Sequence, residues 1–219
     1  MKYYLCICAA VLLFFSCNTG PTPVKTVMLA DVEPFSLGAV NASMDQVLSS
    51  GPKAISVEVI FHPRENAVAL DFKHETLRYW QFWDEPARQS FIAGLKSYND
   101  DFTNRNLNTN YRKTRKVYGA VKGRLEWHTL SFSAIYQSSP VIELGYRFKG
   151  ESPYFSTYQN TAKEETAKNQ GITESRSFYM YFTRAQGEEL AKLFDQAYLI
   201  GLVGAITPPP PAVPNRDIY

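Results

Sequence analysis

The sequence has few cysteines, and their positions restrict the kinds of fold that they could stabilise. Of the three, Cys6 and Cys8 lie inside one apolar run near the start, so Cys17 is the only cysteine in the rest of the chain. A lone cysteine can form neither an intrachain disulfide nor a paired-cysteine metal site. A disulfide-stabilised scaffold and a cysteine-rich metal fold are therefore excluded.

Strong charge and the short motifs of common active sites are also absent. The formal net charge is +2, which gives no reason to expect nucleic acid as a partner. The chain has no His-Glu-x-x-His run, no Asp-rich calcium loop, no glycine-rich phosphate loop and no Gly-x-Ser-x-Gly elbow. We therefore expect no metal and no cofactor.

The longest apolar run near the start is too short to span a membrane. It covers 13 residues, from Tyr3 to Phe15, whereas a transmembrane helix needs about 20. A short apolar run behind a basic residue, here Lys2, is typical of an export signal. We expect residues 1–16 to be removed.

The end of this run resembles the lipobox of bacterial lipoproteins, in the looser form known from spirochaetes. The segment is Leu13-Phe14-Phe15-Ser16-Cys17, with a small residue directly before the cysteine. The resemblance implies lipid on Cys17, which would consume the thiol and exclude thiol catalysis. Two or more acyl chains anchor a protein stably. An ordinary signal peptide and an uncleaved signal anchor are the alternatives.

The residue after Cys17 bears on location. In the sorting rule known from enteric bacteria, an Asp at this position retains a lipoprotein in the inner membrane, so Asn18 favours the outer membrane of the cell envelope by resemblance. Residues 17–25 then form a lipidated tether, with two prolines.

The composition fits one domain, which we place at residues 26–206, before a Pro-rich tail at 207–219. Aromatic residues are numerous, with 14 Tyr, 14 Phe and 3 Trp, and aromatic side chains favour β-structure. The proline run after Thr207 ends any helix. The chain is thus predicted to carry a single folded unit between two polar ends.

The clearest pattern is a hairpin over residues 54–75. Apolar and polar residues alternate on both sides of the turn at Pro63 to Asn66. If the numbers of facing residues sum to 129, Phe61 meets Val68 and Val59 meets Leu70 on one face. A third strand, Leu77 to Trp83, follows.

Helical spacing begins after Asp84, which suits a helix N-cap, and predicts a helix from Glu85 to Phe102. A similar unit follows Phe178 to Phe182, where Thr183 and Gln186 form a capping-box pattern. The second helix is expected to continue into an apolar end that packs in the core. The chain therefore consists of two related strand-then-helix halves, or the two joints are alike by chance.

Three further strands are predicted at Lys116 to Trp127, Thr129 to Tyr136 and Val141 to Lys149. Together the pattern predicts an α+β domain, a curved antiparallel sheet with two helices covering one face. A β-barrel or sandwich with helical caps is the alternative. Residues 151–177 read as a long polar loop, either a mobile excursion or a lid.

Two features are candidates for function. One is a basic cluster that could contact anionic lipid or a protein partner, unless its lysines only protect a strand edge. Its members are Arg112, Lys113, Arg115, Lys116, Lys122 and Arg124. The other is the pair Glu58 and Asp71, which the hairpin register brings face to face and which Lys73 could neutralise.

The sequence therefore favours a membrane-anchored envelope lipoprotein whose domain binds or scaffolds something without catalysis. An envelope hydrolase that uses the surface carboxylates is the alternative.

Overall fold

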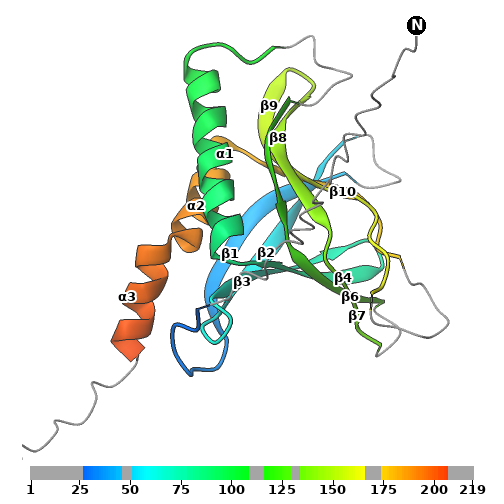
Figure 1. Cartoon of the computed structure of the whole chain (residues 1–219). Helices are drawn as coiled ribbons and strands as arrows, with labels where there is room; N and C mark the ends of the chain where they lie inside the picture. Colours follow the sequence, from blue (N-terminus) through cyan, green and yellow to red (C-terminus); the bar gives the residue numbers. More distant parts are fainter. Residues whose placement is uncertain (1–26, 46–50, 109–115, 130–133, 166–173, 207–219) are drawn as a thin grey trace, which may run out of the picture.

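The computed structural model describes residues 27–45, 51–108, 116–129, 134–165 and 174–206, which form a curled antiparallel sheet with helices packed against it (Figure 1). The strands run in the order β5-β8-β9-β10-β1-β2-β3-β4-β6-β7. Their bounds are β1 (Phe35–Met44), β2 (Lys53–His62), β3 (Ala67–His74), β4 (Leu77–Trp83), β5 (Lys116–Lys122), β6 (Arg124–Thr129), β7 (Tyr136–Ser138), β8 (Val141–Lys149), β9 (Ser152–Gln159) and β10 (Phe178–Phe182). The helices are α1 (Glu85–Thr103), α2 (Arg184–Phe194) and α3 (Gln196–Ile206).

The two ends of this strand order meet in one long, bent hairpin. Only Gly123 separates β5 from β6, and its amide donates to the Pro140 carbonyl between β7 and β8 at 3.1 Å. The register continues across this point, because Lys122 faces Val141 and Leu125 faces Ser138. A Cβ at Gly123 would lie 2.7 Å from Cδ1 of Ile142 and 3.3 Å from the Phe82 carbonyl oxygen, so a larger residue here would displace the end of the Ile142 side chain. On one side of the bend, β8 of the hairpin pairs with β9; on the other side, β6 pairs with β4. The hairpin therefore connects the two ends of the sheet, and the sheet is curled.

The order of elements is the same in the two parts of the chain. β1 to β4 form an antiparallel meander that ends in α1. The long hairpin, β9 and β10 form a second meander, which ends in α2. This topology has the two strand-then-helix halves that the sequence suggested.

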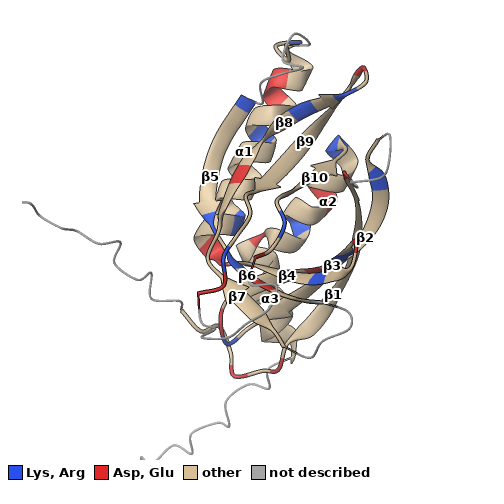
Figure 2. Cartoon of the chain, turned by 90° about the vertical axis from the view of Figure 1, so that its right-hand side faces the viewer, with Lys and Arg blue, Asp and Glu red and all other residues tan. Residues whose placement is uncertain are grey.

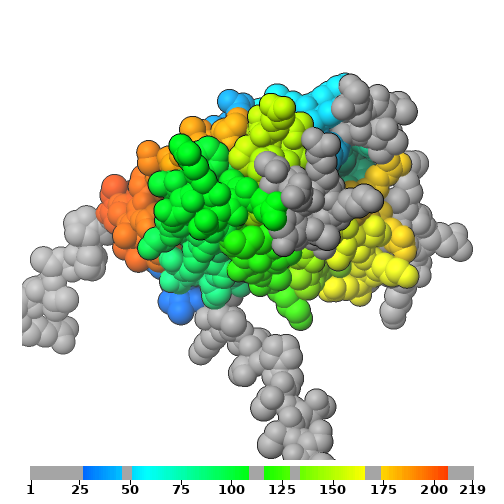
Figure 3. Space-filling model, turned by 90° about the horizontal axis from the view of Figure 1, so that it is seen from above, coloured from blue at the N-terminus to red at the C-terminus, as the bar shows by residue number. Residues whose placement is uncertain are grey.

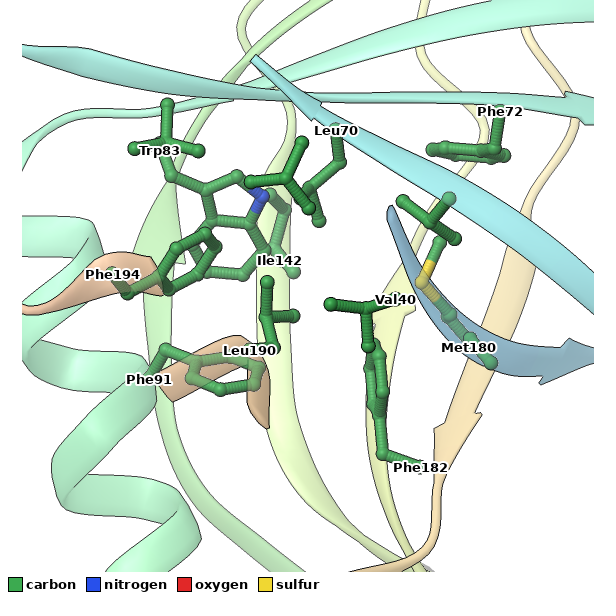
Figure 4. Close-up of a cluster of buried hydrophobic side chains, with 14 of the residues drawn as sticks. Val40, Leu70, Phe72, Trp83, Phe91, Ile142, Met180, Phe182, Leu190 and Phe194 are labelled. Carbon is green, nitrogen blue, oxygen red and sulfur yellow. The ribbon is translucent and has the colours of Figure 1, made fainter. Parts of the chain in front are cut away.

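The core lies between the inner face of the sheet and the helices. Phe91 of α1 is fully buried, with its ring centroid 5.2 Å from that of Phe155 and 5.1 Å from that of Phe194. Figure 4 shows Phe91, Phe194 and Leu190 facing Trp83 and the sheet. The apolar helix faces therefore pack on one side of the sheet, as predicted for the α+β architecture.

Both predicted helix caps are present. The Asp84 carboxylate accepts from the Ala87 amide at 2.9 Å. Thr183 and Gln186 make both hydrogen bonds of a capping box. The two strand-to-helix joints are thus fixed by local sequence.

Arg88 links the start of α1 to the end of α2. Its fully buried guanidinium donates to the main-chain carbonyls of Asn66, Trp83 and Phe194 at 2.7, 3.1 and 3.2 Å. It also donates to the side chains of Asn66 and Gln196. Burial lowers the pKa of Arg88 to about 10, so the group stays charged at neutral pH.

The predicted hairpin is confirmed, both in its two antiparallel strands and in their register. Val59 faces Leu70 and Phe61 faces Val68, as the sum of 129 requires. The strand at Leu77 to Trp83 is also present, and α1 extends one residue past the predicted end.

Two predictions about local structure are wrong. Ser152 to Gln159 belongs to β9 in the middle of the sheet, so 151–177 is not one long loop. The predicted strand Thr129 to Tyr136 is not one strand: β6 ends at Thr129, β7 begins at Tyr136, and Ala134 and Ile135 lie in neither strand. Residues 130–133 and 166–173 lie outside the described residues.

Two further differences concern β1 and the last helix. β1, which pairs with both β2 and β10, was not predicted at all. The second helix ends at Phe194, because Asp195 is extended (ψ 126°), and α3 is a separate helix.

Candidate functional site

Four tyrosines line the outer side of the sheet where β9 and β10 lie side by side. Their neighbours Phe155, Met180 and Phe182 point inward and are buried in the core. Because successive residues of a strand point to opposite faces, the tyrosines point outward. We call this surface the tyrosine face, and its members are Tyr154, Tyr158, Tyr179 and Tyr181, with Arg147 of β8.

The rings of the tyrosine face are ordered against each other. The ring centroids of Tyr158 and Tyr179 are 4.3 Å apart at an interplanar angle of 29°, and those of Tyr179 and Tyr181 are 5.7 Å apart at 8°. Tyr154 meets Tyr181 edge-on at 6.3 Å. Cross-strand aromatic pairs of this kind stabilise a sheet and hold the rings in fixed positions.

Two cations from β8 cover these rings. The guanidinium carbon of Arg147 lies 4.3 Å from the ring centroid of Tyr179, and the Lys149 ammonium lies 4.6 Å from that of Tyr181. Both distances are within the range of a cation–π interaction. Arg147 and Tyr179 therefore form a flat, partly exposed pair.

Tyr181 anchors the cluster. It is fully buried, and its hydroxyl donates to the Asp45 carboxylate at 2.6 Å, which also accepts from Lys149 at 2.7 Å. Burial, and then the bond to Asp45, raise the pKa of Tyr181, so the phenol stays protonated. Tyr154, Tyr158 and Tyr179 are half-buried.

This arrangement is suited to binding. Tyr and Arg are enriched at the centres of protein interfaces, where rigid rings provide contact area with little loss of side-chain entropy. Two surface cavities, of about 280 and 400 Å³, contain none of these tyrosines. The tyrosine face is therefore part of the outer side of the sheet and lines neither cavity.

The structure divides the predicted basic cluster. Arg112, Lys113 and Arg115 lie outside the described residues. Lys116 forms an ion pair with Asp101 of α1, and Arg124 pairs with Glu65 at 2.7 Å and Glu126 at 3.6 Å. Figure 2 shows basic and acidic residues interspersed along the described ribbon. Contact of the whole cluster with lipid or protein stays a prediction.

The predicted carboxylate pair has a cationic partner that the sequence did not suggest. Glu58 faces Asp71, and both line the cavity of about 400 Å³. Arg78 of β4 donates to both oxygens of Asp71, at 2.8 and 2.5 Å. Asp71 is thus neutralised by Arg78 and not by Lys73, while hydrolase chemistry at this pair stays untested.

The three histidines lie apart from one another, each against a different aromatic ring. Among the residues that the structure describes, no three His, Cys, Asp or Glu side chains gather to hold a metal ion. His62 packs against Phe82, His74 is buried beside Phe178, and His128 stacks on Trp80. No helix within the described ranges combines the length and hydropathy of a membrane span.

The tyrosine face was not predicted, because the polar composition of residues 151–177 indicated a loop. The signal was present in the alternation of Tyr154 and Tyr158 with residues that are buried. On β10 the outward tyrosines, Tyr179 and Tyr181, are two residues apart, whereas those of β9 are four apart with Ser156 at the position between them.

Comparisons with known proteins give a family. A family model described as "Uncharacterised Treponema protein" matches residues 34–200. No curated protein and no solved structure matches the chain. The match spans β1 to α2 and the first five residues of α3, and therefore covers the whole sheet.

Proposed function

Because this chain belongs to the family of uncharacterised Treponema proteins, we propose a function from its own residues: a lipid-anchored envelope lipoprotein whose domain binds a protein partner, without catalysis. The tyrosine face is the binding surface. The observation that carries the proposal is the stack of Arg147 on Tyr179 and of Tyr179 on Tyr158.

The anchor in this proposal is lipid on Cys17. It is supported by the lipobox-like segment before Cys17, and Treponema is a spirochaete, the group in which such looser segments are known. Asn18 favours the outer membrane over the inner membrane. Anchoring would hold the tyrosine face close to other envelope proteins.

A protein partner is preferred over a small ligand. Small-molecule sites are concave and enclose most of the ligand, whereas these rings lie along the outside of a sheet. Arg147, Tyr158 and Tyr179 provide aromatic and guanidinium surface at one place, the composition of an interface hot spot. Lys149 and Asp45 surround it with charge that can define orientation.

The proposal is tested by site-specific photo-crosslinking in cells. A photo-reactive phenylalanine analogue at Tyr158 is expected to give a discrete product, whose partner is identified by mass spectrometry. The matched control carries the same probe at Ile135, which is 61% exposed but lies before β7. With the purified partner, Tyr179→Ala should weaken binding by about 30-fold, as for a central hot-spot residue.

Three outcomes would contradict the proposal. Equal products from the Tyr158 and Ile135 probes would mean that the tyrosine face is not selective. Unchanged affinity of Tyr179→Ala and Arg147→Glu for the purified partner would place its binding elsewhere. Acyl labelling that is the same in Cys17→Ala and in the native chain would contradict the lipid anchor.

A further inference from the structure

The last helix has an apolar surface that the rest of the domain leaves uncovered. α3 contains no charged residue, and only Leu199 and Val203 are buried. Tyr198, Ile200 and Ile206 are 43%, 52% and 51% exposed. Figure 3 shows α2 and α3, in orange, at one side of the molecule.

This exposure is built into the chain by the break at Asp195. Asp195 ends α2 in an extended conformation, and its carboxylate accepts from the Tyr198 amide at 2.8 Å, as an N-cap does. A continuous helix was expected to carry its apolar end into the core. The break instead directs α3 away from α1 and the sheet, as Figure 1 shows.

The start of the described chain lies at the same end of the molecule. The Leu29 amide donates to the Pro63 carbonyl at 3.0 Å in the turn between β2 and β3. Arg88 joins that turn, at Asn66, to Gln196 at the start of α3. Val27 and Met28, 68% and 57% exposed, add apolar surface there. Figure 1 shows these first residues, in dark blue, near α3.

The distance from Cys17 to this end is limited by the chain itself. Ten residue steps separate Cys17 from Val27, and at most about 3.5 Å per step they span no more than about 35 Å. A lipid on Cys17 would therefore keep the end that carries α3 near the bilayer surface.

We infer that α3, with Val27 and Met28, rests on the lipid surface as a second contact beside the anchor. The inference rests on the proposed lipid on Cys17. At about 1.5 Å per residue, α3 is about 16 Å long and cannot cross a hydrocarbon core of about 30 Å. It lies in the interfacial layer, where apolar side chains enter the acyl boundary and a tyrosine such as Tyr198 is favoured.

The charges around α3 select no lipid headgroup. The cavity of about 430 Å³ between α2 and α3 is lined by Lys192 and also by Glu189 and Asp195. Attraction therefore comes from apolar area, and the contact forms on neutral phosphatidylcholine. This separates it from contact through the predicted basic cluster, which would need anionic lipid.

The test uses the natural lipidated chain, in which lipid would block Cys17. Ile200→Cys then adds the only free thiol, which is labelled with an environment-sensitive fluorophore. The protein is reconstituted in phosphatidylcholine vesicles that contain a nitroxide phospholipid. Quenching at position 200 should exceed that at the matched control, Ile135→Cys, by at least about threefold. Adding Ile206→Asp should reduce it, since a carboxylate disfavours insertion.

The outcomes separate this inference from the proposed function. If the native chain itself takes up the thiol-reactive label, Cys17 is free and the anchor is wrong. If Cys17 is blocked and the chain is anchored, equal quenching at positions 200 and 135 overturns the inference alone. A label at position 200 that is shielded from iodide but not quenched by the nitroxide lipid would mean that α3 packs against a second copy, which also overturns it.

Discussion

Replacing Arg88 by methionine is expected to destabilise the domain, although it removes a buried charge. Arg88 is fully buried and donates only to neutral acceptors, three of which are main-chain carbonyls of Asn66, Trp83 and Phe194. Methionine has similar length but no donor. The three carbonyls would then lose their hydrogen bonds to Arg88 inside the protein.

The size of the effect follows from two opposed contributions. An unsatisfied buried acceptor costs about 1–3 kcal/mol, which gives about 3–9 kcal/mol for three carbonyls. Part of this is recovered, because a buried cation costs several kcal/mol in lost hydration. We expect the free energy of unfolding to fall by about 3 kcal/mol. Arg88→Lys should lose at least as much, since an ammonium keeps the charge but cannot reach all these acceptors.

The assay is urea unfolding followed by tryptophan fluorescence. Lys96→Met, at an exposed position of the same helix, is the matched control and should change stability by less than about 0.5 kcal/mol. If Arg88→Met lies within about 1 kcal/mol of the native protein, the hydrogen bonds of Arg88 contribute no more than its desolvation costs, and the reasoning fails.

Three further predictions concern pH, helix packing and the α3 cap. Burial lowers the pKa of His74 below 6.5, so the unfolded chain binds a proton more readily than the folded chain does. The free energy of unfolding should therefore fall as the pH drops from 7 to 5, and it should fall less steeply in His74→Gln. Equal pH slopes in the two proteins would contradict a contribution from His74. Gly187→Ala should cost about 1–3 kcal/mol in urea unfolding, because its Cβ would lie 2.7 Å from Leu95, whereas Gly201→Ala, with nothing within 4 Å, should be neutral or stabilising. Asp195→Ala should weaken α3 by about 0.5–2 kcal/mol, seen as faster amide exchange over residues 196–206 with α1 unchanged; slow exchange in the variant would show that the cap is dispensable.

Sequence patterns predicted the structure correctly where the interacting residues lie close together in the chain. The hairpin of β2 and β3 has its turn and both apolar faces within about twenty residues, and its register followed directly. Asp84 and Thr183 cap helices through amides three residues away. These capping hydrogen bonds depend only on residues within one helical turn of each other.

Patterns failed where the partner is distant in the sequence. β9 pairs with β10 across a gap of about twenty residues, and the segment between them is polar, so its strand was read as loop. β1 takes its second partner, β10, from the far end of the chain.

The sequence by itself determined the lipobox-like segment, the lone Cys17, the first hairpin and the caps of α1 and α2, because these depend on residues close together in the chain. Only the tertiary structure decided which surfaces remain outside. The tyrosine face exists because β9 and β10 are neighbours, and α3 is exposed on one side because only Leu199 and Val203 of this helix pack into the core. Side chains from distant segments become one surface through strand pairing and packing, which no local pattern encodes.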